Sequence, residues 1–254
     1  MIQYRSSDGR ATVTIDDPER RNPMSTDVMR GLLDATRRAA DEDDVRVIVY
    51  TGAGKAFSAG GDLSAGFVDD ALGRHQERGA LADLFRLMDR CGKPTVARVN
   101  GHALAGGFGL AVACDITICV DDAKLGTTEV RVGLWPMMIS AILARTVPRK
   151  AALDLMLTGR VIDAYEAQRI GAVSRVVTRD ELDAAVDEVV EGLLTASPAS
   201  FLIGKDSFSG IADLGFDAAL DRLQGGLTEA ALTSDAAEGI AAFIEKRDPD
   251  WSGT

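Results

Sequence analysis

GHALAGGFGLAVACD, residues 101–115, is the segment from which the fold of this sequence can be argued. From Gly107 onward it reads as an apolar helix, yet it carries glycine at positions 101, 106, 107 and 109. A glycine inside a helix is about 1 kcal/mol less favourable than alanine, so Gly107 and Gly109 together would cost about 2 kcal/mol. Glycines kept at that cost indicate that a neighbouring backbone or a ligand approaches this segment closely.

The segments around this stretch predict strands that alternate with helices. Residues 94–99 (PTVARV) and 116–120 (ITICV) read as strands on either side of it, and 45–52 (VRVIVYTG) reads as a strand buried on both faces. Helices are predicted over 26–40, 75–90 and 180–194, and the turn signal SSDG predicts a hairpin at the N-terminus. Strand, glycine loop and helix recur about every 50 residues, which indicates stacked βα-type turns.

The pattern changes near Pro198, because everything from Ser197 onward reads as helical. We therefore divide the chain into a core, residues 1–195, and a C-terminal helical region, residues 196–254. The last predicted helix, DAAEGIAAFIEKR, is amphipathic and suited to docking on the core or on another subunit.

Composition and charge exclude several classes of protein. The 254 residues are 46% hydrophobic and 26% charged, as in an ordinary soluble globular protein. The net charge of −11 argues against nucleic acid, an anionic membrane or another broad polyanionic partner, but it allows a small anionic ligand held by a few cations. We expect a protein of one large domain.

The cysteines and the apolar runs point to a cytoplasmic protein. Cys91, Cys114 and Cys119 are odd in number and dispersed, which predicts buried free thiols in a reducing compartment. The N-terminal residues alternate like strands and lack the pattern of a signal peptide. The apolar runs are broken well short of the ~20 residues that a membrane span needs.

Familiar ligand motifs are missing from the sequence. Lys55 is followed by Ala56 where a P-loop requires serine or threonine, and Phe57 stands where a dinucleotide fingerprint requires its third glycine. His75 and His102 have no metal-ligand spacing to each other or to the cysteines, so no metal is predicted.

Two glycine loops and one carboxylate remain as candidates for a site. The loops are FSAGGD, residues 57–62, and LAGGFG, residues 104–109, and Glu129 lies in the apolar setting TTEVRVGL. Gly106 is placed at the start of a helix, where unpaired N–H groups favour negative charge. N–H groups from two such loops would form an oxyanion hole, and a carboxylate in an apolar pocket has a raised pKa suited to proton transfer.

Simpler interpretations of these features stay open. Paired glycines also serve tight packing of a helix on a strand. Glu129 is equally well read as a surface charge or as the partner of Arg131 in an ion pair. Trp135, Met137 and Met138 are interpreted as pocket wall or core.

Four segments in order resemble the crotonase (enoyl-CoA hydratase/isomerase) superfamily. They are FSAGGDL (57–63), KPTVARVNGHALAGGFGLAVACDI (93–116), LGTTEVRVGLWP (125–136) and LTGRVIDAYEAQRIGAVSRVV (157–177). The resemblance implies an α/β fold, a crotonase-like spiral of ββα turns whose C-terminal helical region forms a homotrimer or a dimer of trimers. It also implies an acyl-CoA substrate, no metal and no cofactor beyond the CoA moiety.

The resemblance assigns roles to individual residues. The N–H groups of Gly61 and Gly106 match the oxyanion-hole donors that hold the thioester oxygen, and Glu129 matches a catalytic glutamate. The residues matched to CoA binding are Ala59, through its carbonyl, and the cations Arg20, Arg21, Lys55 and Lys246.

The sequence departs from the family at the second catalytic acid. Hydratases of the family use two glutamates, and the first falls on Gly109 here. The acid of the dienoyl-CoA isomerases falls on Met137. A single carboxylate suffices for an enoyl-CoA isomerase, in which one base takes a proton from one carbon and returns it to another.

We therefore predict an enzyme of the enoyl-CoA hydratase/isomerase family that forms an enolate in an oxyanion hole, with double-bond isomerisation favoured. The alternatives are a hydratase that uses Glu129 alone and an inactive acyl-CoA-binding homologue. A second acid could also come from the polar segment with Asp69, Asp70, His75 and Glu77, which is otherwise read as a solvated lid.

Overall fold

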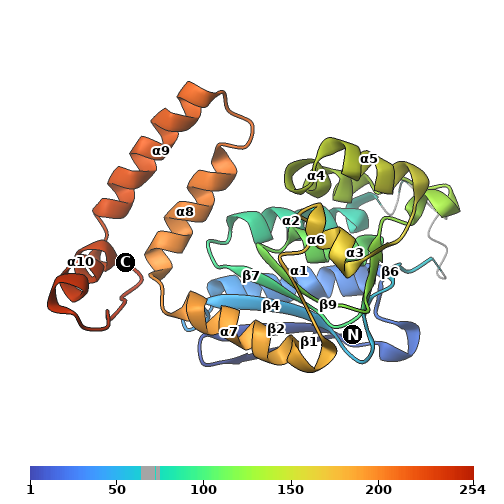
Figure 1. Cartoon of the computed structure of the whole chain (residues 1–254), viewed down its shortest axis with the longest axis horizontal. Coiled ribbons are helices and arrows are strands. Elements are labelled where there is room, and N and C mark those ends of the chain that lie inside the picture. Colours follow the sequence, from blue (N-terminus) through green and yellow to red (C-terminus); the bar gives the residue numbers. More distant parts are fainter. Residues whose placement is uncertain (64–71, 73–74) are drawn as a thin grey trace.

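A six-stranded sheet forms the centre of the computed structural model, which describes residues 1–63, 72 and 75–254 (Figure 1). Its strand order is β1-β2-β4-β7-β9-β12. The strands are β1 (Ile2–Ser7), β2 (Arg10–Ile15), β4 (Val47–Gly52), β7 (Thr95–Val99), β9 (Ile116–Val120) and β12 (Arg175–Val177). β1 and β2 form the predicted antiparallel hairpin, and each later pair in the order is parallel.

Helices cover this sheet and account for its apolar strands. α1 (Thr26–Asp41) packs on β1 and β2, α3 (Gly106–Ala113) packs on β7, and α7 (Leu182–Leu194) packs on β4, β7 and β9. All of β4 is buried, as expected for a strand covered on both faces. α2 (His75–Arg90) has the predicted bounds, and Ser25 caps α1 by accepting a hydrogen bond from the N–H of Val28.

Short strands beside the main sheet give the chain its spiral form. β5 (Ala56–Ser58), β8 (His102–Leu104), β10 (Lys124–Gly126) and β11 (Ile162–Asp163) form a second sheet in the order β11-β10-β8-β5. The chain passes from β4 to β5, from β7 to β8 and from β9 to β10, so each turn contributes one strand to each sheet. This topology confirms the predicted spiral of ββα turns.

Two details differ from the sequence-based expectation. The predicted loop FSAGGD, residues 57–62, overlaps β5 and contains β6 (Gly60–Gly61), which pairs with β3 (Pro23–Met24). The turns are also uneven, since β4, β7, β9 and β12 begin at residues 47, 95, 116 and 175. The turn from β7 to β9 is short because its helix, α3, has only 8 residues.

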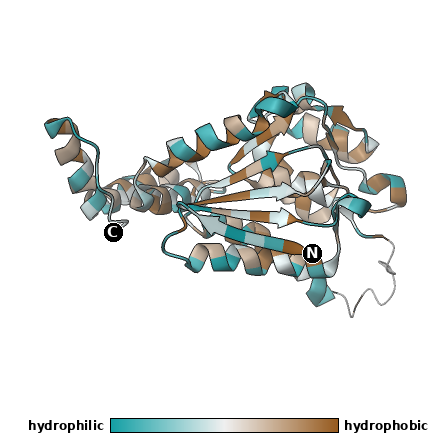
Figure 2. Cartoon of the chain, turned by 90° about the horizontal axis from the view of Figure 1, so that it is seen from below, coloured by the Kyte–Doolittle hydropathy of each residue, from teal (hydrophilic) through white to brown (hydrophobic). Residues whose placement is uncertain are grey.

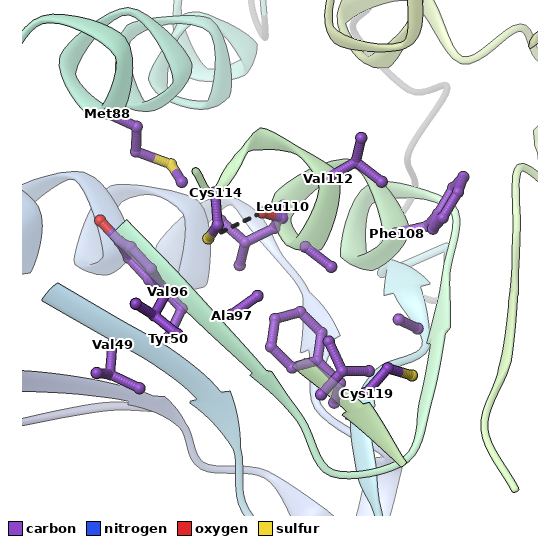
Figure 3. Close-up of a cluster of buried hydrophobic side chains, with 14 of the residues drawn as sticks. Val49, Tyr50, Met88, Val96, Ala97, Phe108, Leu110, Val112, Cys114 and Cys119 are labelled. Atoms are coloured by element: carbon purple, nitrogen blue, oxygen red, sulfur yellow. Dashed lines mark hydrogen bonds between the residues drawn. The ribbon is translucent and has the colours of Figure 1, made fainter. Parts of the chain in front are cut away.

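Buried apolar side chains fill the space between the main sheet and the helices (Figure 3). Tyr50 of β4 and Phe108 of α3 are fully buried there. Cys114 and Cys119 are buried and Cys91 is half-buried, and all three are free thiols, as predicted. Burial raises the pKa of all three, that of Cys119 to about 12.

The remaining elements lie around this core. They are η1 (Pro18–Arg20), η2 (Glu129–Val132), α4 (Met137–Thr146), α5 (Arg149–Thr158), α6 (Ala164–Arg169) and η3 (Arg179–Glu181). α4 packs on α3, and α5 packs on η2. Among the described residues, no helix is both long and apolar enough to cross a membrane.

The C-terminal arm, α8 (Pro198–Gly210), α9 (Phe216–Ala231) and α10 (Ser234–Glu245), extends from one end of the molecule (Figures 1 and 2). Asp235 connects α10 to the start of α8 and to the last residues of the chain. Its carboxylate accepts hydrogen bonds from Ser197 Oγ at 2.7 Å and from the N–H groups of Ser252 and Gly253, each at 2.9 Å. Asp235 is buried, and these contacts fix the last residues of the chain against the start of α8.

Candidate active site

A cavity of about 500 Å³ lies where the two glycine loops meet η2 and α4. Ala59, Gly61, Gly106 and Glu129 line it, so the structure brings together residues from three separate parts of the sequence. The volume is within the range of about 300–1,000 Å³ that is typical of small-molecule sites.

The first glycine loop is held from beneath by Asn22. This side chain is fully buried, and its Nδ2 donates to the carbonyls of Ala53 at 2.9 Å and Ala56 at 2.8 Å. Ser58 Oγ donates to the Asn22 carbonyl at 2.7 Å and accepts from the Gly60 N–H at 3.2 Å. Hydrogen bonds with buried partners therefore fix the backbone that leads to Gly61.

The second glycine loop packs directly against the first. A Cβ on Gly60 would lie 2.6 Å from Ala105 Cβ and 2.7 Å from the Leu104 carbonyl oxygen. A Cβ on Gly107 would lie 2.5 Å from Ser58 Cβ and 2.8 Å from the Ser58 carbonyl oxygen. Only glycine permits this approach, and it explains the Gly107 that a helix would otherwise disfavour.

Gly106 begins α3, so its N–H has no acceptor within the helix. The residue before it, Ala105, has φ of 48° and ψ of −124°, a rare conformation for a residue with a Cβ. The Ala105 N–H donates to the Gly126 carbonyl at 2.8 Å, and its carbonyl accepts from the Gly109 N–H at 3.0 Å. These bonds hold the strained residue that sets the direction of the Gly106 N–H.

Glu129 opens η2 and lies at the wall of the cavity. Its Oε2 is buried and makes no hydrogen bond to any described residue. Burial raises the pKa of Glu129, although its own backbone N–H partly opposes this by donating to the carboxylate. A carboxylate with these properties is suited to accepting and returning a proton.

Apolar side chains make up most of the remaining wall. Trp135, Met137 and Met138 line the cavity, which agrees with their interpretation as pocket wall. Trp135 Nε1 donates to Ser140 Oγ at 3.1 Å, which fixes the indole ring against the first turn of α4. Arg78 of α2 also reaches the cavity.

The position of the missing second acid is covered by an aliphatic side chain. Gly109 is buried beneath Ile139 of α4, which lines the cavity and is 3% exposed. A Cβ on Gly109 would lie 2.6 Å from Ile139 Cγ1 and 3.1 Å from Ile139 Cδ1.

The predicted CoA-binding cations are only partly at the site. Arg20 forms an ion pair with Asp62 at 2.7 Å, directly after Gly61, and Arg21 and Lys55 are exposed. Lys246 caps α10, on the C-terminal arm at the opposite end of the molecule from β6 (Figure 1). Within its own chain Lys246 is therefore separate from the cavity, and its contact with CoA stays a prediction.

The segment considered as a source of a second acid is described only in part. Asp69 and Asp70 lie outside the described residues. His75 and Glu77 begin α2, and Glu77 forms an ion pair with Arg30 at 3.4 Å. Among the described residues that line the cavity, Glu129 is the one carboxylate.

Asn22, Ser58 and Ile139 are site residues that sequence reasoning missed. The pair Asn22–Pro23 is a recognised turn signal, so Asn22 could have been selected as a candidate. Nothing local marks Ser58 or Ile139, because their partners lie 36 and 30 residues away, at Asn22 and Gly109 respectively.

Comparison with known proteins gives a consistent result. The family model described as enoyl-CoA hydratase/isomerase matches residues 5–254. A Thermus thermophilus protein, provisionally named an enoyl-CoA hydratase, is 40% identical over 249 residues, which cover 94% of this chain and 96% of that protein. A carnitinyl-CoA dehydratase from Salmonella heidelberg is 31% identical and covers 95% of this chain and 94% of its own.

Solved structures agree with the sequence comparison. The crystal structure of an enoyl-CoA hydratase from Mycobacterium smegmatis superimposes with a TM-score of 0.93 at 29% identity, covering 98% of both chains. The match extends over the core and the C-terminal arm.

Proposed function

Because the chain belongs to the enoyl-CoA hydratase/isomerase family, we propose that its cavity binds an enoyl-CoA thioester and moves the double bond from the β,γ to the α,β position. The observation that carries this proposal is the single carboxylate, Glu129, among the described residues of a cavity that also contains Gly61 and Gly106.

The reaction needs one base and one site for negative charge. Glu129 removes a proton from the α-carbon, and the electrons of that C–H bond delocalise through the thioester carbonyl and the double bond as a dienolate. The N–H groups of Gly61 and Gly106 stabilise the oxyanion; removing one such donor typically costs about 3 kcal/mol. The protonated Glu129 then returns the proton to the γ-carbon, which leaves the double bond between the α- and β-carbons.

The environment of Glu129 favours this shuttle. A raised pKa makes the carboxylate a stronger base and allows the proton to stay in the cavity between the two steps. The apolar wall formed by Trp135 and the methionines suits an uncharged acyl chain beside the reacting carbons.

Hydration of the α,β double bond is the second candidate function. The names of the Thermus thermophilus and Mycobacterium smegmatis proteins favour it. In that reaction Glu129 alone would activate water, whose hydroxyl adds to the β-carbon while a proton adds to the α-carbon.

The test compares turnover of a 3-enoyl-CoA and a 2-enoyl-CoA by the wild type and by Glu129→Gln. We expect isomerisation of the 3-enoyl-CoA to fall about 10²–10⁴-fold in the variant, the usual contribution of a positioned acid or base. Glu191→Gln is the matched control, because it removes an exposed carboxylate of α7 that does not line the cavity. CoA-ester binding without turnover by the wild type would instead identify an inactive acyl-CoA-binding homologue.

We also propose that the C-terminal arm joins subunits into a homotrimer or a dimer of trimers. Large apolar side chains are exposed along it, among them Phe208, Phe216, Leu227, Leu232 and Phe243, each at least 72% exposed. Burying such side chains is the usual driving force for association. Light scattering should give the mass of three or six chains, and a monomer at micromolar concentration would contradict the proposal.

A further inference from the structure

We infer that Ile139 determines which reaction the site performs, by occupying the space above Gly109 and so keeping a second acid and its water away from the substrate. The inference rests on the proposed function. It concerns a residue for which neither the sequence nor the comparisons suggest a role.

The packing of α4 on α3 supports the first step. Ile139 comes from the first turn of α4, and its Cγ1, Cδ1 and Cγ2 atoms would lie 2.6, 3.1 and 3.3 Å from a Cβ on Gly109. A Cβ essentially never lies within 3.0 Å of a non-bonded heavy atom of another part of the chain, so even alanine at position 109 displaces Ile139. Ile139 therefore fits in this position only because residue 109 has no side chain.

The position of Ile139 supports the second step. The side chain is almost fully buried and still lines the cavity that contains Glu129, so it separates Gly109 from the substrate space. A glutamate at position 109 would have to pass through Ile139 to reach the cavity. An ordered water needs two to four polar partners, and the hydrocarbon surface of Ile139 offers none.

The consequence concerns which of the two reactions, hydration or isomerisation, the site catalyses. Hydration requires water at the β-carbon, and the family's hydratases use two glutamates for it. With Ile139 packed over Gly109, the position that the resemblance matches to the first glutamate, return of the proton from Glu129 to the γ-carbon is the outcome that the described cavity supports. Ile139 is thus a specificity-determining residue, and Glu129 provides the chemistry.

A thermodynamic cycle tests the packing without any activity measurement. Gly109→Ala should lower the melting temperature by up to about 8 °C, because the overpacking of the new methyl group outweighs the better helix propensity of alanine. Ile139→Ala should also lower it, but Gly109→Ala combined with Ile139→Ala should be more stable than the sum of the two losses predicts. Additive losses would overturn the inference.

A partition measurement tests the specificity. The wild type and Gly109→Glu/Ile139→Ala are given 2-enoyl-CoA and 3-enoyl-CoA, and the hydrated and isomerised products are quantified. We expect the double variant to raise the ratio of hydration to isomerisation by about 10²-fold, the lower end of what one added acid or base contributes. Leu143→Ala is the matched control, because it truncates a fully buried side chain one turn further along α4 and should leave the ratio unchanged.

The possible results separate this inference from the proposed function. If the wild type isomerises through Glu129 but the ratio stays constant in the double variant, Ile139 does not set specificity and the proposed function stands. If the wild type hydrates 2-enoyl-CoA as fast as it isomerises 3-enoyl-CoA, Ile139 does not exclude hydration and the inference fails, whereas isomerisation through Glu129 still stands. If the wild type catalyses neither reaction, the proposed function fails and the inference fails with it.

Discussion

Gly107→Ala should destabilise the protein although alanine is the better helix residue. Gly107 is the second residue of α3, where alanine gains at most about 1 kcal/mol in helix propensity. The new methyl group would lie 2.5 Å from Ser58 Cβ and 2.8 Å from both the Ser58 carbonyl oxygen and its Oγ. Ser58 cannot move aside easily, because it is fully buried and hydrogen-bonded to Asn22 and Gly60.

The magnitude follows from these opposing terms. Overpacking costs about 1–3 kcal/mol, and contact with a fixed carbonyl oxygen places this site in the upper part of that range. After subtracting the gain in propensity, we expect a net loss of about 2 kcal/mol, which lowers the melting temperature by about 4–8 °C. Because Ser58 precedes the loop that leads to Gly61, kcat/KM should fall as well; a misplacement of about 1 Å can cost 10²-fold.

Thermal unfolding and kcat/KM would be measured side by side with Gly192→Ala. Gly192 lies in α7 with open space around it, so alanine there should gain up to about 1 kcal/mol and leave the rate unchanged. A Gly107→Ala protein that melts at or above the wild-type temperature would refute the reasoning, since it would show that the two glycine loops do not need their close contact.

The further predictions concern three polar side chains. The isomerisation rate should rise with pH as Glu129 ionises, with an apparent pKa above the usual range for glutamate. Because its folded-state pKa is raised, Glu129 lowers stability as pH rises through that range, so Glu129→Gln should melt above the wild type at neutral pH. Burial alone would raise the pKa of Asp235, but hydrogen bonds from Ser197, Gly253 and Ser252 hold it below its usual range. Asp235→Ala should therefore lose about 3 kcal/mol of unfolding free energy at neutral pH. The stability of this variant should also depend less on acid than that of the wild type in pH-dependent denaturation. Ser58→Ala should lose about 1–3 kcal/mol in a urea titration, because the Gly60 N–H loses its acceptor.

Local patterns predicted the longer elements of the fold. The apolar stripe and the Ser25 cap determine α1, and the alternation around SSDG determines the hairpin of β1 and β2. In each case the signal extends over at least six residues and the partner is close in the sequence or is the core as a whole. Elements of this kind can be recognised from their periodicity, because the apolar face that packs on the core repeats along the chain.

The short strands were beyond prediction for a physical reason. β5 and β6 contain three and two residues and pair with β8 and β3, so no alternation can develop within them. Their backbone forms strands because distant segments supply the hydrogen-bond partners. Gly60 of that segment was read as a loop residue, whereas it permits the close approach of Leu104 at the end of β8.

The candidate site was predictable as a set of residues but only partly as an arrangement. The resemblance selected Gly61, Gly106 and Glu129, which line one cavity. It also selected Lys246, which lies on the C-terminal arm, and the direction of that arm depends on the packing of α8 against α2. Neither that direction nor the position of Ile139 over Gly109 can be predicted from the local sequence pattern.

The native thiols make this chain a convenient scaffold for site-specific labelling. Cys91, Cys114 and Cys119 remain protonated near neutral pH, and thiol reagents attack the thiolate form. A cysteine introduced at Met137, which is 71% exposed at the cavity wall, would therefore be labelled far faster than the native three. A fluorophore at that position would report directly on acyl-CoA binding, with every native cysteine left in place.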